Sequence, residues 1–336
     1  MHHHPSTVTV LPETHDRAEW LEQRRHGIGS SDASVIMGLS DYESPYTLWE
    51  QKTGRAPLDP PVDAVTEELR EWGNRLEPVI RAAVSEELGV DIIKTDQAWA
   101  HKDYPWLRAN LDGIVDGQDT IYEFKNTSAF NRALWDDQIP DHAEIQVHHT
   151  ALVTGWKNAV VAGLIGGNHL SIHRVTINPN ILEMMWEAEQ RFWHHVETDT
   201  PPDVDWHQRT KDALATEWRQ SRTTGTQEVA EADARKWVEQ YHQAHADEKD
   251  AEKRKREATN NLLKLMAGHD QIATGDKIWA KTRRGRIDAK RLQADHADLY
   301  AKYLTRPALD TDRLKQEHPD IYAEYQTITI TPQAIA

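Results

Sequence analysis

The chain has 336 residues, which is enough to bury a substantial core in one large domain or in two. It contains no cysteine, which excludes disulfides, thiolate metal sites and cysteine-bound iron–sulfur clusters. A formal net charge of −16 argues against a nonspecific nucleic-acid coat, because phosphate binding depends largely on lysine and arginine. No apolar run reaches the roughly 18 residues that span a bilayer, and residues 1–5 lack a signal-peptide core, so we expect a cytoplasmic protein.

Glycines and small hydroxyl residues lead from a basic pair into an apolar helix within residues 24–38. Ser30, Ser31 or Asp32 is available to cap this helix. Because a helix N-terminus presents free N–H groups, and Arg24 and Arg25 precede it, the segment is a candidate phosphate pocket. A plain capped helix with surface arginines fits the same residues.

A second helix is predicted over residues 72–88, where apolar residues recur at helical spacing and Gly89 follows as a C-cap. Glu77 lies at the border of the apolar stripe. A carboxylate in that position usually reaches water. If it faces inward instead, it adds an acid to any site formed there.

The segment between Asp112 and Glu123 is typical of a strand, a tight turn and a second strand, which would bring the two carboxylates together. Side chains alternate along a strand, so Glu123 and Lys125 should share one face while Phe124 joins the core. Two close carboxylates repel unless a cation lies between them, and Mg²⁺ prefers oxygen ligands. The same residues also fit ordinary turn chemistry beside a solvated charge pattern.

Residues 143–155 form another predicted helix, which ends at a glycine. Gln146 on this helix points either toward the carboxylates or to the surface. His148 and His149 are neighbours, and neighbouring residues on a helix face different directions, so we interpret them as non-ligating.

A domain boundary is predicted at residues 198–203, which are polar and interrupted by proline. Residues 1–200 contain 16 Lys and Arg against 32 Asp and Glu, whereas residues 201–336 contain 23 of each. The net negative charge therefore lies entirely in the N-terminal part, and DNA would have to be guided there by local basic patches or by an oligomer. We expect a tail over 1–19, a core over 20–200 and an extension over 201–336.

The extension begins with a long helix over about residues 228–267 that is polar almost all round, as in an exposed arm or half of a helical hairpin. A hairpin with a Gly-Asp turn is predicted over residues 271–281. The basic residues 282–286 are interpreted as a turn, which either contacts DNA phosphates or is simply solvated.

Most of the thirteen tryptophans fall within apolar patterns and are expected in the core; these include Trp49, Trp72, Trp156, Trp186 and Trp193. Trp106 and Trp135 lie in loop-like sequence. Each is a candidate wedge at a duplex end, because aromatic side chains can insert beside bases.

Five blocks in one order resemble the YqaJ-type viral recombinase family, phage alkaline exonucleases similar to lambda exonuclease in the PD-(D/E)XK nuclease superfamily. The blocks are residues 27–33, 44–54, 73–78, 111–113 with 123–125, and 146–147 with 153–155. One departure is Leu111, which replaces the proline that names the superfamily. That proline carries no reactive group, so its loss removes no chemistry.

The resemblance implies an α/β fold, a mixed sheet flanked by helices, followed by a mostly helical extension with a small hairpin. It implies that Asp112, Glu123 and the backbone carbonyl of Phe124 ligate metal, with Glu77 contacting the metal directly or through water. Lys125 would orient or activate the attacking water, and Gln146 would assist. Arg25, Ser30 and Ser31 would hold a terminal 5′-phosphate.

The activity implied is Mg²⁺-dependent 5′→3′ digestion of linear double-stranded DNA, with Mn²⁺ able to substitute and two ions used in turnover. The product strand would pass to a single-strand-annealing protein during phage-type recombination in a bacterial host cell. The family also implies a homo-oligomeric ring, commonly a trimer. Two alternatives stay open: an endonuclease or repair nuclease with the same site, and a catalytically silent DNA-binding or assembly module.

Overall fold

A computed structural model of the chain describes residues 5–60, 62–95, 97–221, 226–305 and 308–332. Residues 1–4, which belong to the segment predicted to lack a signal-peptide core, lie outside the described residues. Contacts divide the chain into two units, residues 1–223 and 224–336, so the division falls later than the predicted residue 200. The reason is α7 (Gln208–Ser221), whose Thr210 hydroxyl donates to Ser44 Oγ at 2.7 Å in the first unit. Part of the predicted tail is also structured, because β1 (Val8–Val10) pairs with β2 (Trp99–His101).

The first unit is built on a mixed sheet, as predicted. Its strand order is β4 (Thr120–Thr127), β5 (Asn158–Ile165) and β6 (His169–Thr176), with β4 parallel to β5 and β5 antiparallel to β6. Parallel neighbours need a crossover connection. Here it consists of the 3₁₀ helix η1 (Ala129–Leu134) and α5 (Asp141–Thr154).

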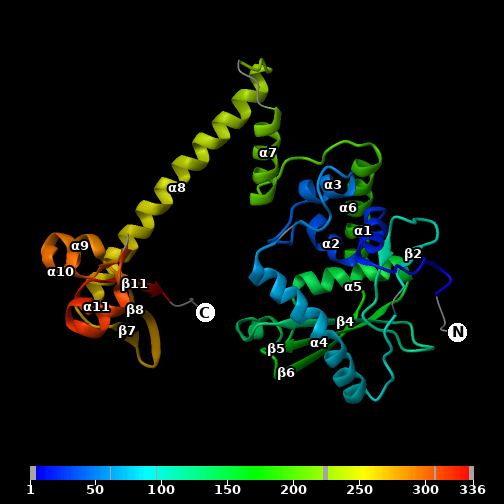
Figure 1. Ribbon diagram of the computed structural model, residues 1–336, viewed down its shortest axis with the longest axis horizontal. Helices are drawn as coiled ribbons and strands as arrows, with labels where there is room; N and C mark the ends of the chain where they lie inside the picture. Colours follow the sequence, from blue (N-terminus) through cyan, green and yellow to red (C-terminus); the bar gives the residue numbers. More distant parts are fainter. Residues whose placement is uncertain (1–4, 61, 96, 222–225, 306–307, 333–336) are drawn as a thin grey trace. The chain divides into compact units, whose positions relative to one another are not determined.

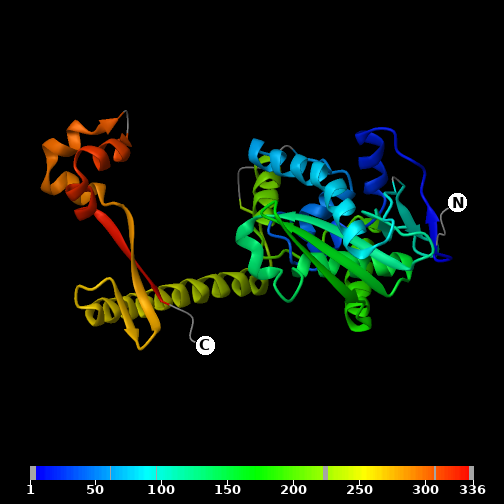
Figure 2. The same cartoon turned by 90° about the horizontal axis from the view of Figure 1, so that it is seen from below.

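Helices cover both faces of this sheet (Figures 1 and 2). On one face Ile80 and Val84 of α4 (Ala64–Leu88) pack with Tyr122 and Phe124 of β4. On the other face, α5 packs against the neighbouring β4 residue Ile121. The alternation predicted for residues 123–125 is thus confirmed, because Phe124 joins the α4 core and its two neighbours face the α5 side. The helix α4 begins earlier than predicted but ends as expected at Gly89, which has φ 65°.

The first unit also contains a second, antiparallel sheet and four further helices. The sheet consists of β1, β2 and β3 (Arg108–Ala109). The helices are α1 (Arg17–Arg25), α2 (Ser30–Ile36), α3 (Pro45–Lys52) and α6 (Pro179–Glu197). The turn between α1 and α2 lies against β3, where Ile28 N donates to Trp106 O at 2.7 Å. A Cβ on Gly27 would lie 2.6 Å from Trp106 O, so only glycine allows this approach.

The structure corrects three tryptophan predictions. Trp135 is 2% exposed and packs over Gly163, which excludes it as a wedge. Trp106 stacks with Trp186 and Trp193, at centroid distances of 5.7 and 6.1 Å. Trp72, predicted in the core, is 46% exposed, because it lies on the outer side of α4.

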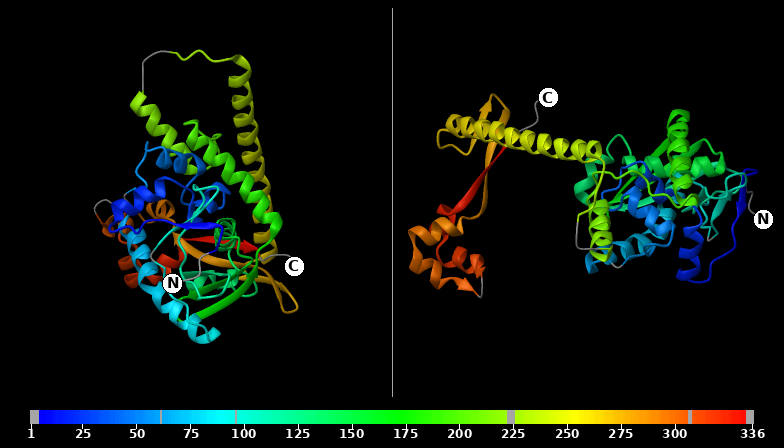
Figure 3. Two further views of the ribbon diagram at one scale, coloured as in Figure 1. Left: turned by 90° about the vertical axis from the view of Figure 1, so that its right-hand side faces the viewer. Right: turned by 90° about the horizontal axis from the view of Figure 1, so that it is seen from above.

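The second unit begins with α8 (Glu231–Met266), the long exposed helix that the sequence predicted (Figure 3). A sheet of order β11-β8-β7 follows, formed by β7 (Gln271–Thr274), β8 (Lys277–Ile287) and β11 (Gln326–Pro332). The predicted hairpin is confirmed. The basic residues 282–286, however, continue β8 instead of forming a turn, because β11 pairs with them from a distant part of the chain.

Between β8 and β11 the chain contains an internal duplication. The pattern Asp-x-x-Arg-Leu-x-x-x-His-x-Asp-x-Tyr-Ala-x-Tyr occurs from Asp288 to Tyr303 and again from Asp310 to Tyr325. The first copy forms α9 (Ala289–Asp295) and α10 (Ala297–Lys302), and the second forms α11 (Thr311–Glu317) and α12 (Pro319–Glu324), with the short strands β9 (Leu304–Thr305) and β10 (Ala308–Leu309) between them.

The two copies contact each other reciprocally. The Tyr303 hydroxyl donates to Glu317 of the second copy, and the Tyr325 hydroxyl donates to Asp295 of the first at 2.9 Å. Leu292 and Leu314, which occupy equivalent places, are both fully buried in one shared core. Each copy therefore completes the core of the other.

We predict that Leu292→Ala and Leu314→Ala destabilise the second unit by similar amounts, about 3 kcal/mol each, because both remove buried methyl groups from equivalent places. Chemical denaturation of the full chain measures this. Leu304→Ala is the control, since Leu304 is 49% exposed, and it should cost less than about 0.5 kcal/mol. Strongly unequal costs for the two buried leucines would contradict the equivalence of the copies.

Candidate active site

A pocket of about 190 Å³ lies in the first unit where α1, α2, β4 and α5 meet. It is lined by predominantly polar and charged side chains. They include the predicted residues Ser30, Ser31, Asp112, Glu123, Lys125 and Gln146, together with Trp20, Gln23, Arg24, Arg108 and Asn110.

Asp112 and Glu123 are brought together by a shorter pairing than predicted. The chain pairs across the turn only at a single bridge, between Gly113 and Tyr122, and the regular strand begins at Thr120. Asp112 is fixed by its own side chain, whose Oδ2 accepts the backbone N–H of Phe124 at 2.8 Å. This bond holds the carboxylate of Asp112 beside that of Glu123.

Lys125 connects the carboxylates to α5. Its Nζ lies 2.5 Å from Glu123 Oε1 and also donates to Gln146 Oε1. Gln146 therefore points toward the carboxylates and not to the surface. Burial alone would lower the pKa of Lys125, but the charges of Glu123 and Asp112 outweigh it and raise that pKa.

The two carboxylates repel each other in a mostly buried place. Burial and then the neighbouring charge of Glu123 raise the pKa of Asp112 to about 8. A divalent cation bound by both would remove this penalty, and hard oxygen donors are those that Mg²⁺ prefers. The residues present therefore fit a magnesium ion. Among the described residues, no three His, Asp or Glu side chains gather closely enough to hold a metal by themselves, so backbone oxygens or water would have to complete the ligand set.

Glu77 does not line the pocket. Its Oε1 accepts from Arg81 Nη2 at 2.6 Å, one turn further along α4. The Nε of Arg81 donates in turn to the backbone carbonyl of Asp112 at 2.9 Å. Arg81 thus connects α4 to the carboxylate pair, a role that the sequence reasoning missed although the i,i+4 spacing from Glu77 could have indicated it.

The predicted phosphate residues divide between two places. Ser30 and Ser31 line the pocket, but Arg25 turns away, with Nη1 donating to Gln51 O at 2.6 Å. Arg24 lines the pocket instead. Arg24 and Trp20 are one helical turn apart on α1 and in cation–π contact at 5.0 Å, a spacing that could have indicated which arginine shares the pocket with Trp20.

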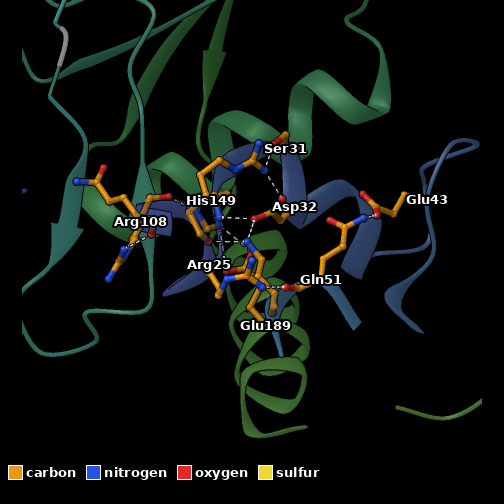
Figure 4. Close-up of polar contacts among 12 residues, drawn as sticks. Arg25, Ser31, Asp32, Glu43, Gln51, Arg108, His149 and Glu189 are labelled. Atoms are coloured by element: carbon orange, nitrogen blue, oxygen red, sulfur yellow. Dashed lines mark hydrogen bonds and ion pairs between the residues drawn. The ribbon is translucent and has the colours of Figure 1, made fainter. Parts of the chain in front are cut away.

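Asp32 lies behind the pocket and contacts several positively charged or N–H groups (Figure 4). Gly29 caps α2, not Ser30, Ser31 or Asp32 as expected, and Asp32 in the first turn accepts from the Gly29 N–H at 3.0 Å. The same carboxylate contacts Arg24 at 2.5 Å and the fully buried Nζ of Lys52 at 2.7 Å. Burial alone would raise the pKa of Asp32, but these two cations and the N–H hold it well below its usual range.

The rings of His148 and His149 form hydrogen bonds within the first unit. His148 Nε2 accepts from the Asn178 N–H at 3.0 Å. His149 is fully buried, with Nδ1 3.0 Å from the Glu189 carboxylate and Nε2 2.9 Å from Arg108 O. Burial alone would lower the pKa of His149, but the charge of Glu189 outweighs it and raises that pKa.

We predict that Glu189→Gln destabilises the chain by about 3 kcal/mol at pH 6, because it leaves His149 buried without its counter-charge. The raised pKa of His149 contributes stability below the unfolded value of about 6.5, and this stability is lost as the pH rises through the folded value. The cost should therefore be smaller at pH 9. Chemical denaturation at both pH values measures it. The exposed Glu187→Gln on the same helix is the control, and an equal cost at both pH values would contradict a charged His149.

The fold and the pocket define a mixed α/β domain with paired carboxylates, a lysine and an arginine in one site. Residues 19–157 match the model of the YqaJ-like viral recombinase domain, so the chain is similar to that family over this part. The chain is also similar to the uncharacterized protein YqaJ of Bacillus subtilis (strain 168), with 29% identity over 292 residues, 85% of this chain and 90% of that protein.

Two solved structures are similar over 59% of this chain and 98% of theirs. One is LHK-Exo in complex with dAMP, with 16% identity and a TM-score of 0.47. The other is the alkaline exonuclease LHK-Exo from Laribacter hongkongensis, with 14% identity and a TM-score of 0.45. Among the described helices of our chain, none has the length and apolar character needed to cross a membrane.

Proposed function

We propose that the chain is a metal-dependent nuclease that digests linear double-stranded DNA from its ends in the 5′→3′ direction. One observation carries this proposal. The carboxylates Asp112 and Glu123, with Lys125 and Gln146, line the same pocket as Arg24 and the two serines. A cleavage site and a site for a phosphate group are thus side by side, as an enzyme that starts at a phosphorylated end requires.

Asp112 and Glu123 would hold a divalent cation, Mg²⁺ or in its place Mn²⁺, with the Phe124 carbonyl as a further oxygen ligand. When bound, the ion supplies positive charge where negative charge develops on the scissile phosphate, and it lowers the pKa of water. Two ions during turnover and a water-mediated contact from Glu77 are parts of the same proposal. Because Glu77 is paired with Arg81, its effect on the metal site would pass through that arginine.

Lys125 would act by position and charge. Its Nζ is held between Glu123 and Gln146, so an ammonium donor stands at a defined place beside the carboxylates. An ammonium can hold the attacking water and stabilise the phosphate oxygens, but it cannot accept a proton. Gln146 keeps this group in place, which makes it a positioning residue.

Arg24 replaces Arg25 in the proposed phosphate pocket. A guanidinium forms directed hydrogen bonds with phosphate oxygens, and Arg24 Nη2 already lies 3.1 Å from Ser31 Oγ. Holding a terminal 5′-phosphate here would bring the adjacent phosphodiester bond to the carboxylates. The polarity of digestion follows from this order of sites.

The digestion product would be single-stranded DNA for a phage-type annealing protein, in the cytoplasm of a bacterial host. A homo-oligomeric ring around the duplex is proposed on the family resemblance. Such a ring could also assemble a basic channel from local patches, although the net charge of residues 1–200 is negative.

The test is digestion of one plasmid in linear and in closed circular form, with Mg²⁺ and with EDTA. The linear form should be degraded only with Mg²⁺, faster from 5′-phosphate than from 5′-hydroxyl ends, and the circle should survive. Cleavage of the circle would favour the endonuclease alternative. Absence of any cleavage with Mg²⁺ or Mn²⁺ while DNA binding persists would favour the silent module.

A further inference from the structure

The β8 strand of the second unit is unusually basic. Five of its residues are exposed cations, in a chain whose formal net charge is −16; they are Lys277, Lys281, Arg283, Arg284 and Arg286. Within the described part of the chain, none of the five forms an ion pair with an acidic residue. Five like charges on one strand repel each other, so an anionic partner would relieve a cost that the chain itself leaves in place.

The alternation of β8 brings part of this charge onto one face. Ala280 is fully buried, so Lys281 points to the opposite face, and Arg283 follows it at the same spacing. Trp279 is the extra residue at an irregularity in the pairing of β8 with β7, where Ala273 pairs with Ile278 and Ile272 with Ala280. The side chains of Trp279, Lys281 and Arg283 are all exposed. The strand therefore presents two cations on one face, and an exposed aromatic ring two residues before the first of them.

The indole ring of Trp279 is held in place by contacts on β7 and β8. Its Nε1 donates to Thr274 Oγ1 of β7 at 3.1 Å, which fixes the ring, and Lys277 Nζ lies 4.3 Å from the ring centroid. The ring is 36% exposed although an indole is costly to leave in water. An exposed, fixed aromatic beside a row of cations is the arrangement with which proteins bind unpaired bases and their phosphates.

By contrast, two of the three arginines of α8 form ion pairs within the same unit. Arg235 lies 2.6 Å from Glu231, and Arg254 lies 3.0 Å from Asp250. The basic residues of α8 are interspersed with acidic ones, whereas β8 contains no acidic residue.

We propose that the exposed side chains of β8, Lys277, Trp279, Lys281 and Arg283, bind single-stranded DNA. Bases would stack on Trp279 while Lys281 and Arg283 neutralise successive phosphates. A duplex lacks exposed base faces along its length, so the tryptophan favours an unpaired strand. The inference extends the proposed nuclease function by assigning a place for its product strand, but the binding itself requires neither metal nor cleavage.

The test measures binding of the full chain to a fluorescent oligothymidylate in EDTA, which separates binding from nuclease activity. Lys281→Glu/Arg283→Glu should weaken binding at least tenfold and reduce the slope of log affinity against log salt by about 1.4, the value for two phosphate contacts on a single strand. Trp279→Ala should weaken binding about tenfold and leave that slope unchanged.

The matched control is Lys249→Glu/Lys253→Glu on α8, which changes the net charge equally in the same unit and should leave affinity within twofold. Equal weakening by this control would overturn the proposal, since the effect would then be one of net charge. So would unchanged affinity in the β8 variants, or an equal loss of duplex binding in Trp279→Ala. If wild-type chain binds the oligonucleotide through β8 but cleaves no duplex, the proposed function fails while this inference stands.

Discussion

Asp112→Asn is expected to lower the rate of Mg²⁺-dependent cleavage of linear duplex DNA by about 10³-fold or more, equivalent to about 4 kcal/mol of transition-state stabilisation. The change keeps the shape of the side chain and an oxygen that can accept the Phe124 N–H, but it removes one of the two buried negative charges. Gel assays of a 5′-phosphorylated linear fragment measure the rate. Asp119→Asn is the control, because Asp119 is an exposed residue of the same turn and should keep full activity.

The same substitution should make the metal-free chain more stable. Burial and Glu123 raise the pKa of Asp112 from its usual value to about 8. The protonated form therefore favours the folded state, its contribution is complete below about pH 4, and it is lost as the pH rises through about 8. In EDTA at pH 9 the Asn variant should unfold at a higher temperature than the wild type. At pH 5 the difference should be small.

Adding Mg²⁺ should reverse this order, because only the wild type gains the binding energy of the ion. Thermal denaturation with and without Mg²⁺ measures both effects. A variant that is equally stabilised by Mg²⁺, or that keeps its nuclease activity, would remove Asp112 from the proposed site. Loss of activity with a lower melting temperature in EDTA would instead indicate a purely structural role.

The arrangement of the carboxylates and the lysine in the pocket could be predicted because it depends on local rules. Strand alternation assigns Glu123 and Lys125 to one face whatever the rest of the chain does. A glycine after a helical stripe ends that helix, as at Gly89 and Gly155. The order of the sequence blocks along the chain then predicted that Gln146 lies in the same site.

The predictions that failed depend on partners far away in the sequence. Residues 282–286 were predicted to form a turn, but they form a strand because β11 pairs with them. Trp135 was predicted in a loop at the surface, but its ring packs against Gly163. Arg24 and Arg25 differ only in the direction that each faces on α1. The helical spacing shows that Arg24 shares a face of α1 with Trp20. Choosing between the two arginines also required knowing which face of α1 meets the pocket.

The internal duplication was missed for a different reason. The first copy has three acidic and three basic residues and the second has five acidic and two basic, so the copies differ in charge, although Asp288 to Tyr303 aligns with Asp310 to Tyr325 without a gap. Comparing the chain with itself would have found it. The burial of Leu292 and Leu314 then follows from their equivalent places.

The second large effect is expected at Asp32. Asp32→Asn leaves the buried ammonium of Lys52 and the guanidinium of Arg24 without their shared counter-charge, so we expect a loss of about 3 kcal/mol in the free energy of unfolding at pH 7. The low pKa of Asp32 means that this contribution is present above about pH 4, the unfolded value, and disappears as the pH falls toward the folded value. Asp199→Asn, which breaks an exposed ion pair with Arg55, should cost less than about 1 kcal/mol.

A second variant separates stability from function at this place. Asp32→Asn/Lys52→Met removes both buried charges, so most of the stability should return, because an apolar pair of similar volume often replaces a buried ion pair without cost. The orientation of Arg24 should not return, since its guanidinium still lacks the carboxylate that holds it at 2.5 Å. We therefore expect the double variant to be folded and active but to digest 5′-phosphate and 5′-hydroxyl ends at similar rates. If it kept the wild-type preference for phosphorylated ends, Arg24 would bind phosphate without help from Asp32, and the buried charges would serve the fold alone.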